Sequence, residues 1–183
     1  MTIIALTGMP AAGKGEVAAV AQQRGWAVHR IGDLVWEETE QRGLELAPAS
    51  VGAVANGERE AHGYGVWASR SLPHIDALRA AGSHVLIDGM RGEQELVVFR
   101  AAYGDALVTV AVVASAEQRL ALVQQRGRID DGDAAAFHAR DERELGWSLA
   151  ETIAAADETL ANEGELDALR AAAGELLARF ESL

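Results

Sequence analysis

IALTGMPAAGKGEVAAV, residues 4–20, joins an apolar run to a glycine-bounded loop and then to a helical pattern. The apolar run at 2–7 is typical of a buried parallel strand, and residues 13–24 predict a helix. Between them the spacing GxxxxGK predicts a loop that binds phosphate. Glycines let backbone N–H groups approach phosphate oxygens, and the positive end of the following helix adds to the attraction. We therefore expect these loop residues to hold a nucleotide: Gly8, Met9, Pro10, Ala11, Ala12, Gly13, Lys14 and Gly15.

Lys14 is the only lysine of the chain, although the sequence contains 16 basic residues. A lysine ammonium is a compact charge that reaches the β- and γ-phosphates of a nucleotide. The planar fork of arginine fits a narrow loop poorly. This difference explains why lysine stands here while every other basic position is arginine, and it predicts a catalytic role for Lys14. The alternative is an ordinary turn that contains one lysine.

The rest of the sequence alternates strand and helix patterns. This order predicts an α/β fold with a parallel sheet between two helical layers, in one domain of 183 residues. A turn is expected at Gly32 and Asp33, and capping boxes are expected at Ser115 and Ser148. The remaining strands are predicted at 27–31, 84–88, 106–114 and 158–161. The remaining helices are predicted from the 32–33 turn to residue 42, at 49–81 with a break at 63–65, at 93–102, 115–125 and 135–146, and from 165 onwards.

Composition excludes several classes of protein. A net charge of −12 argues against general binding to nucleic acid, because phosphate backbones require a positive surface. No apolar run reaches the ~20 residues of a membrane span, and the N-terminus lacks the basic region of a signal peptide. We expect a cytoplasmic protein. The acidic, lysine-poor composition is typical of a halophilic cytoplasm or, alternatively, of a GC-rich genome.

A metal site is expected beside the loop. Gly15 stands where many phosphate loops carry the Ser or Thr that holds Mg²⁺. Asp88 ends the predicted strand HVLID, at the edge where ligands bind parallel sheets. We therefore expect ATP with Mg²⁺, and Asp88 to hold the metal through water; its alternative role is to cap the Gly89 turn. Glu16 is a second candidate through water, although an acid in a first helical turn is also favoured by the helix dipole.

Six blocks resemble one family: GMPAAGKGE, RIGDLVWEE, LIDGMRG, RGRIDD, RDERE and ADETLANEGELD. They resemble an archaeal P-loop family related to adenylate kinase and dephospho-CoA kinase, over nearly the full length. The resemblance implies a fold like that of nucleoside monophosphate kinases, with strand order 2-3-1-4-5. It also implies a helical region for the acceptor at about 33–81 and an arginine-bearing lid at about 126–143.

The resemblance assigns several residues to the acceptor side. Asp33 matches the turn that borders the acceptor, and it is the candidate to orient or deprotonate an acceptor hydroxyl. Arg91 matches an arginine that holds the acceptor phosphate. Trp36 stands where an arginine commonly grips that phosphate. Its ring is therefore expected either to stack on a base or to pack inside an amphipathic helix.

The lid prediction depends on arginine. Guanidinium groups suit a transferring phosphoryl group, whose charge is spread over several oxygens. The alternative for each arginine is a salt bridge with a nearby acid. The arginines concerned are Arg126, Arg128, Arg140 and Arg143, and the acids are Asp130, Asp131, Asp141 and Glu144. We expect Arg128 and Arg140 to act on the transferring group and Arg126 to contact the nucleotide.

The segment ADETLANEG, 156–164, resembles the loop that borders adenine, so Asn162 is expected at the nucleotide. Taken together, the sequence predicts an ATP-dependent kinase for a small nucleotide-like acceptor, of the nucleoside monophosphate or dephospho-CoA type. The alternative is a nucleotide-switch ATPase that acts with a protein or ribonucleoprotein partner. The identity of the acceptor and the oligomeric state stay open.

Overall fold

The computed structural model describes residues 1–126 and 134–181. Within these residues the sheet has five strands in the order β2-β3-β1-β4-β5, and every neighbouring pair is parallel. The α/β fold and the strand order 2-3-1-4-5 are therefore confirmed. The strands are β1 (Ile3–Thr7), β2 (Ala27–Arg30), β3 (Val85–Asp88), β4 (Leu107–Val113) and β5 (Glu158–Ala161).

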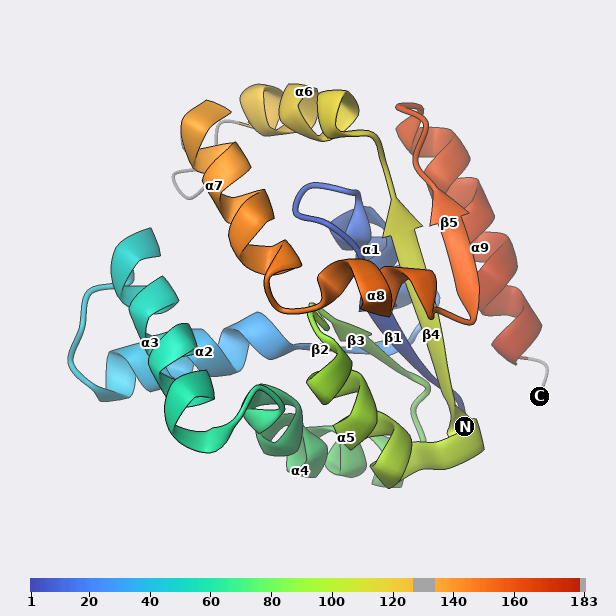
Figure 1. Ribbon diagram of the computed structural model, residues 1–183. Coiled ribbons are helices and arrows are strands. Elements are labelled where there is room, and N and C mark those ends of the chain that lie inside the picture. The colour runs from blue at the N-terminus through green and yellow to red at the C-terminus, as the bar shows by residue number, and fades with distance from the viewer. Residues whose placement is uncertain (127–133, 182–183) are drawn as a thin grey trace.

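Helices connect these strands and cover both faces of the sheet (Figure 1). A short 3-10 helix, η1, follows α5 at Gly104–Ala106. The α-helices of the described part are α1 (Lys14–Gln23), α2 (Ile31–Gln41), α3 (Pro48–His62), α4 (Val66–Ala80), α5 (Glu93–Tyr103), α6 (Ala116–Arg126), α7 (Ala134–Leu145), α8 (Leu149–Ala154) and α9 (Leu166–Glu181). None of the helices described combines the length and apolar character that crossing a membrane requires.

The alternation of side chains along β1 separates two apolar clusters. Ile4 and Leu6 point to one face, where they belong to a buried cluster with residues of α1 and α9. Ile3 and Ala5 point to the other face, where the cluster includes residues of α2, α4 and α5. Because both faces are covered, the central strands are apolar throughout, as a buried parallel sheet requires.

The register of the central strands brings two predicted features to one edge of the sheet. Leu6 of β1 lies opposite Asp88 of β3, and Thr7 lies opposite Ala111 of β4. Parallel strands end at the same edge, so the loop after β1 and the acid at the end of β3 are neighbours.

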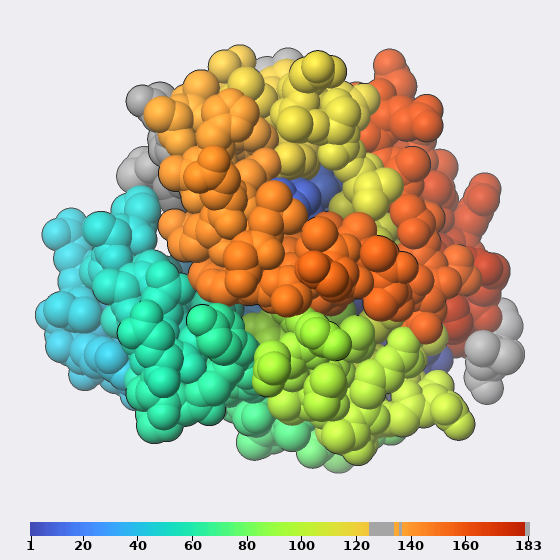
Figure 2. All heavy atoms as spheres, viewed as in Figure 1, coloured from blue at the N-terminus to red at the C-terminus, as the bar shows by residue number. Residues whose placement is uncertain are grey.

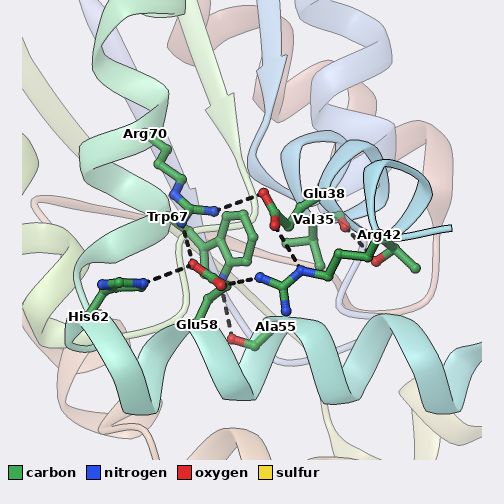
Figure 3. A network of polar contacts seen from close by, with 9 residues as sticks. Val35, Glu38, Arg42, Ala55, Glu58, His62, Trp67 and Arg70 are labelled. Carbon is green, nitrogen blue, oxygen red and sulfur yellow. Dashed lines mark hydrogen bonds and ion pairs between the residues drawn. The ribbon is translucent and has the colours of Figure 1, made fainter. Parts of the chain in front are cut away.

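Three helices form a region beside this edge, which Figure 3 shows from close by. Glu58 of α3 lies between Arg42, just after α2, and Arg70 of α4, and it forms ion pairs with both. The indole N–H of Trp67 in α4 donates a hydrogen bond of 3.2 Å to the carbonyl of Ala55 in α3. These contacts join α2, α3 and α4, which span most of the segment expected to face the acceptor.

Two local predictions are wrong. There is no turn at Gly32 and Asp33, because α2 begins at Ile31 and contains both residues. Ile31 is buried and fixes the start of the helix, and the helix dipole favours Asp33 in the first turn. Ser148 does not cap α8 with its side chain. Its φ of 61° is left-handed, whereas a capping side chain requires an extended backbone.

The other capping box is confirmed. The Ser115 N–H donates to the Gln118 side chain, and the Gln118 N–H donates to the Ser115 hydroxyl, at 3.1 and 3.2 Å. This pair starts α6 directly after β4. In Figure 1, α6 lies above the blue loop that follows β1, and α7 lies to the left of this loop.

Candidate active site

The loop between β1 and α1 lies tightly against its neighbours. Gly8 has a φ of 138°, and a Cβ at this position would lie 2.2 Å from the carbonyl oxygen of Val112. Gly13 has a φ of 110°, and a Cβ there would lie 2.7 Å from the Leu169 side chain and 2.9 Å from that of Asn162. The two glycines of the GxxxxGK pattern are therefore required both by backbone conformation and by space.

The single lysine lies inside the curve of this loop. Lys14 Nζ donates hydrogen bonds to the carbonyl oxygens of Gly8 and Met9, at 2.6 and 2.9 Å. Burial, reinforced by repulsion from Arg91, lowers the pKa of Lys14 to about 8, although Glu144 and Asp88 act in the opposite direction. Lys14 is therefore a desolvated cation, which an anionic ligand would stabilise.

Asp88 is half-buried at the end of β3, close enough to Lys14 to affect its pKa. Its carboxylate has no hydrogen bond or ion pair within the described residues, so its oxygens are not committed there to a protein partner. Glu16, by contrast, forms an ion pair with Arg170 of α9 at 2.7 Å. In the described part of the chain, no three His, Cys, Asp or Glu side chains gather as a metal site.

Two predicted arginines from distant elements meet at one buried acid. Glu144 of α7 is 1% exposed and forms ion pairs with Arg91, which follows β3, and with Arg140 of its own helix. Burial by itself would raise the pKa of Glu144, but Arg91, Arg140 and Lys14 together hold it below its usual value. The salt bridge considered for Arg140 thus exists, and it joins Arg140 to Arg91 beside the loop.

Asn162, directly after β5, contacts the phosphate loop through its side chain. Its side-chain N–H donates to the carbonyl of Ala12 at 3.0 Å, and its side-chain oxygen accepts from the Gly164 N–H at 3.2 Å. The residue is 2% exposed. Its side chain therefore positions the phosphate loop, and the expectation that Asn162 lies at the nucleotide stays a prediction.

No family model matches the chain. A UPF0200 protein of Halobacterium salinarum is 38% identical over 178 residues, which are 97% of this chain and 93% of that protein. A UPF0200 protein of Methanosarcina barkeri is 36% identical over 182 residues, which are 98% of this chain and 96% of its relative. The chain belongs to the UPF0200 family. The resemblance to an archaeal family is thereby confirmed.

Solved structures share the fold of this UPF0200 chain. Dephospho-CoA kinase from Campylobacter jejuni superposes with a TM-score of 0.59, at 14% identity, over 97% of this chain and 96% of that one. Shikimate kinase from Acinetobacter baumannii, solved in complex with shikimate, gives a TM-score of 0.58 at 18% identity, over 100% of this chain and 94% of that one. The UPF0200 chain therefore has the fold of P-loop kinases.

One residue of the UPF0200 chain that sequence reasoning missed joins the loop to α7. Arg119 of α6 is 4% exposed and donates to both carboxylate oxygens of Asp141, at 2.8 and 2.6 Å. It also donates to the carbonyl of Pro10 at 3.2 Å, and its guanidinium lies 5.0 Å from the Phe137 ring centre. No local signal marks Arg119, because Asp141 lies 22 residues further along the sequence.

For the remaining predicted residues, the described part of the structure shows no side-chain contact with the phosphate loop or with Glu144. Arg128 belongs to 127–133, outside the described residues, and the side chain of Arg126 is also not described. Arg143 lies over the ring of Trp147, at 5.9 Å. Asp33 is exposed and has no side-chain partner among the residues described. Trp36 is 53% exposed, so it is not a packing residue of its helix, and the alternative that it stacks on a base stays a prediction.

The loop is accessible at the surface. Figure 2 shows an opening between the yellow segment of α6 and the orange segment of α7 and α8, with blue atoms of the N-terminal part of the chain at its bottom. The edge of the sheet that carries the phosphate loop is thus open to a ligand beside α6 and α7.

Proposed function

We propose that this UPF0200 chain is an ATP-dependent kinase that transfers the γ-phosphate of ATP to a small, nucleotide-like acceptor. The observation that carries the proposal is the meeting of Lys14, Arg91 and Arg140 around one buried carboxylate at the ligand edge of the sheet. The similarity in fold to dephospho-CoA kinase and to shikimate kinase supports the reaction class by analogy only.

The mechanism is positioning with charge neutralisation. Loop amides and Lys14 hold the β- and γ-phosphates of ATP. Arg91 and Arg140 face the oxygens of the transferring group, over which the charge of this group is spread in the transition state. No covalent intermediate with the protein is needed. Asp33 accepts the proton if the acceptor is an alcohol, and a phosphate acceptor needs no base.

The residues present fit a magnesium ion that is bound largely through water. Among the described residues, Asp88 is the only acid near Lys14 whose carboxylate has no protein partner. Gly15 has no side chain that could bind the ion. Hard oxygen ligands and retained waters are what Mg²⁺ prefers. When bound, Mg²⁺ would neutralise charge on the β- and γ-phosphates.

An acceptor screen tests the proposal. The chain is incubated with ATP, Mg²⁺ and either a nucleoside monophosphate or dephospho-CoA, and each acceptor is analysed by mass spectrometry. Transfer should add one phosphoryl group to an acceptor, and the acceptor should accelerate ADP formation, because a kinase excludes water from its site. If no acceptor gains a phosphate while a macromolecule stimulates hydrolysis, the protein is a nucleotide-switch ATPase instead.

Asp88→Asn should raise the Mg²⁺ concentration needed for half-maximal activity by about tenfold or more. The substitution removes the negative charge that attracts the ion but keeps the size of the side chain. Binding of metal-free ATP should change little. Asp105→Asn is the matched control, since Asp105 is exposed in η1, before β4 begins. Equal Mg²⁺ requirements in Asp88→Asn and in the unmodified protein would remove Asp88 from the metal site.

The affinity for ATP should fall as the pH rises through about 8, the value to which burial lowers the pKa of Lys14. Below this pH the ammonium is charged and attracts phosphate, and above it the neutral amine is the main form. The loss should approach about tenfold per pH unit. Calorimetric titration over a pH series measures it. Lys14→Arg should abolish this pH dependence, and a flat profile in the unmodified protein would contradict the prediction.

A further inference from the structure

A separate pocket of about 250 Å³ lies beside the phosphate loop. It forms where α3, the α3–α4 connection, the start of α5 and the α7–α8 connection meet. Its lining includes Arg59, Tyr64, Arg91, Gln94, Trp147 and Ser148. None of these residues except Arg91 was predicted from the sequence to act, because they come from four segments that are distant along the chain.

Arg59 is the unusual group in this pocket. It is only 6% exposed, yet its five N–H donors have a single acceptor among the described residues, Glu95 Oε1, at 3.4 Å. One face of its guanidinium lies on the Trp147 ring, 4.4 Å from the ring centre. A buried guanidinium normally forms several short hydrogen bonds, so Arg59 has donors that a ligand in the pocket can use.

The charges around Arg59 are not balanced. Glu95 is buried and is already engaged by the Arg91 N–H at 2.7 Å, and the Arg91 side chain pairs with Glu144 instead. Burial, together with repulsion from Arg91, lowers the pKa of Arg59. The N–H groups of Glu93 and Gln94, which have no acceptor inside the helix, also lie at this pocket, at the start of α5. The lining also contains Glu93, whose side chain is exposed, so an added negative charge is favoured at one place in the pocket, between Arg59 and the start of α5.

We propose that this pocket binds an oxyanion of the acceptor, a phosphate or a carboxylate, between Arg59 and the start of α5. A flat or apolar part of the acceptor lies against the exposed Tyr64 ring, next to the edge of Trp147. The inference rests on the proposed kinase function, because it assigns the end of the acceptor that is recognised. At about 250 Å³ the pocket is smaller than most small-molecule sites, so it holds one end of the acceptor.

Arg91 connects this pocket to the site of transfer. It lines the pocket, and it is also close enough to Lys14 to lower the pKa of that lysine. An acceptor anchored at Arg59 therefore lies next to the phosphate loop, where its reacting group meets the γ-phosphate of ATP. Recognition of the oxyanion and activation of the phosphoryl group thus share one arginine.

The test measures binding at Trp147 without ATP. The indole N–H resonance of Trp147 is assigned by its loss in Trp147→Phe, and the protein is titrated with AMP, with malate or with adenosine. AMP carries a phosphate, malate carries carboxylates, and adenosine has no oxyanion. The resonance should shift to saturation with AMP, malate or both, according to which oxyanion the pocket takes, and it should not shift with adenosine. Absence of a shift with both anions, or an equal response to adenosine, overturns the proposal.

Substitution of Arg59 completes the test. Arg59→Gln should weaken binding of the anion by about tenfold or more, since it removes a charged, multiply donating group. Arg24→Gln is the control. Arg24 lies at the end of α1, and its substitution removes one positive charge from an exposed ion pair with Glu181. If Arg59→Gln does not fold, Arg59→Lys keeps the charge beside Glu95 and should still weaken binding several-fold by losing the planar fork. Unchanged affinity in the variant that folds overturns the proposal.

The two proposals fail in different ways. If Arg59→Gln does not affect phosphoryl transfer, the proposed kinase function is retained and the proposal of an anion site in the pocket is wrong. If anions bind at Trp147 but no acceptor gains a phosphate, the anion site is retained and the proposed kinase function is wrong.

Discussion

Lys14→Ala and Lys14→Arg should each reduce turnover of ATP by about 100- to 1,000-fold, while the protein folds normally. Alanine removes the ammonium that lies between the Gly8 and Met9 carbonyls. Arginine keeps a charge, but its planar group is too wide for a position that is fixed by two carbonyl oxygens of the same loop. Steady-state formation of ADP with the best acceptor measures the loss.

Folding of the Lys14 variants should be unaffected, because the hydrogen bonds of the lysine side chain within the described residues go only to its own loop. Arg24→Ala is the matched control, a basic residue in an exposed ion pair after the end of α1, and it should keep full turnover. Thermal unfolding and circular dichroism check that all three variants are folded. Full turnover in Lys14→Arg would show that the site needs a positive charge and nothing specific to lysine.

Glu144→Gln should lower the free energy of unfolding by about 3 kcal/mol and turnover by about 100-fold. Glu144 is buried and holds Arg91 and Arg140 together, so its neutralisation leaves two guanidiniums without their shared partner. Glu144 also attracts the Lys14 ammonium and so raises the pKa of Lys14. Without its charge this pKa should be lower, and the affinity for ATP should begin to fall at a pH lower than about 8. Glu144 is a positioning residue, and this pH shift distinguishes that role from a purely structural one.

Glu58→Gln is the matched control for Glu144. Glu58 is also buried between two arginines, Arg42 and Arg70, but it is not among the groups that affect the pKa of Lys14 (Figure 3). Glu58→Gln should lose stability, because among the described residues it leaves Arg42 and Arg70 with only their ion pairs to Glu38, and it should keep the pH dependence of ATP affinity. Chemical denaturation and calorimetric titration separate the two effects. An unshifted pH profile in Glu144→Gln would contradict the role assigned to Glu144.

The sheet and the phosphate loop could be predicted from the sequence because their signals are local. The apolar run of β1, the glycines at 8 and 13 and the helical pattern after Lys14 lie within one stretch of the chain. Each acts through the backbone conformation it favours, so spacing alone indicates the structure. The strand at 158–161 and the capping box at Ser115 were predictable for the same reason. Where two local signals competed, as at Gly32 and Asp33, burial of Ile31 decided the outcome.

The surroundings of the loop were decided by tertiary structure alone. The partners of Arg91 and Arg119, Glu144 and Asp141, lie 53 and 22 residues along the chain, and only the packing of α6 and α7 over the sheet edge brings them together. Arg59 and Trp147 meet in the same way. A salt bridge or a ring contact acts over a few ångströms in space and has no fixed spacing in sequence. The sequence therefore determined the position and conformation of the phosphate loop, and the fold determined which side chains surround it.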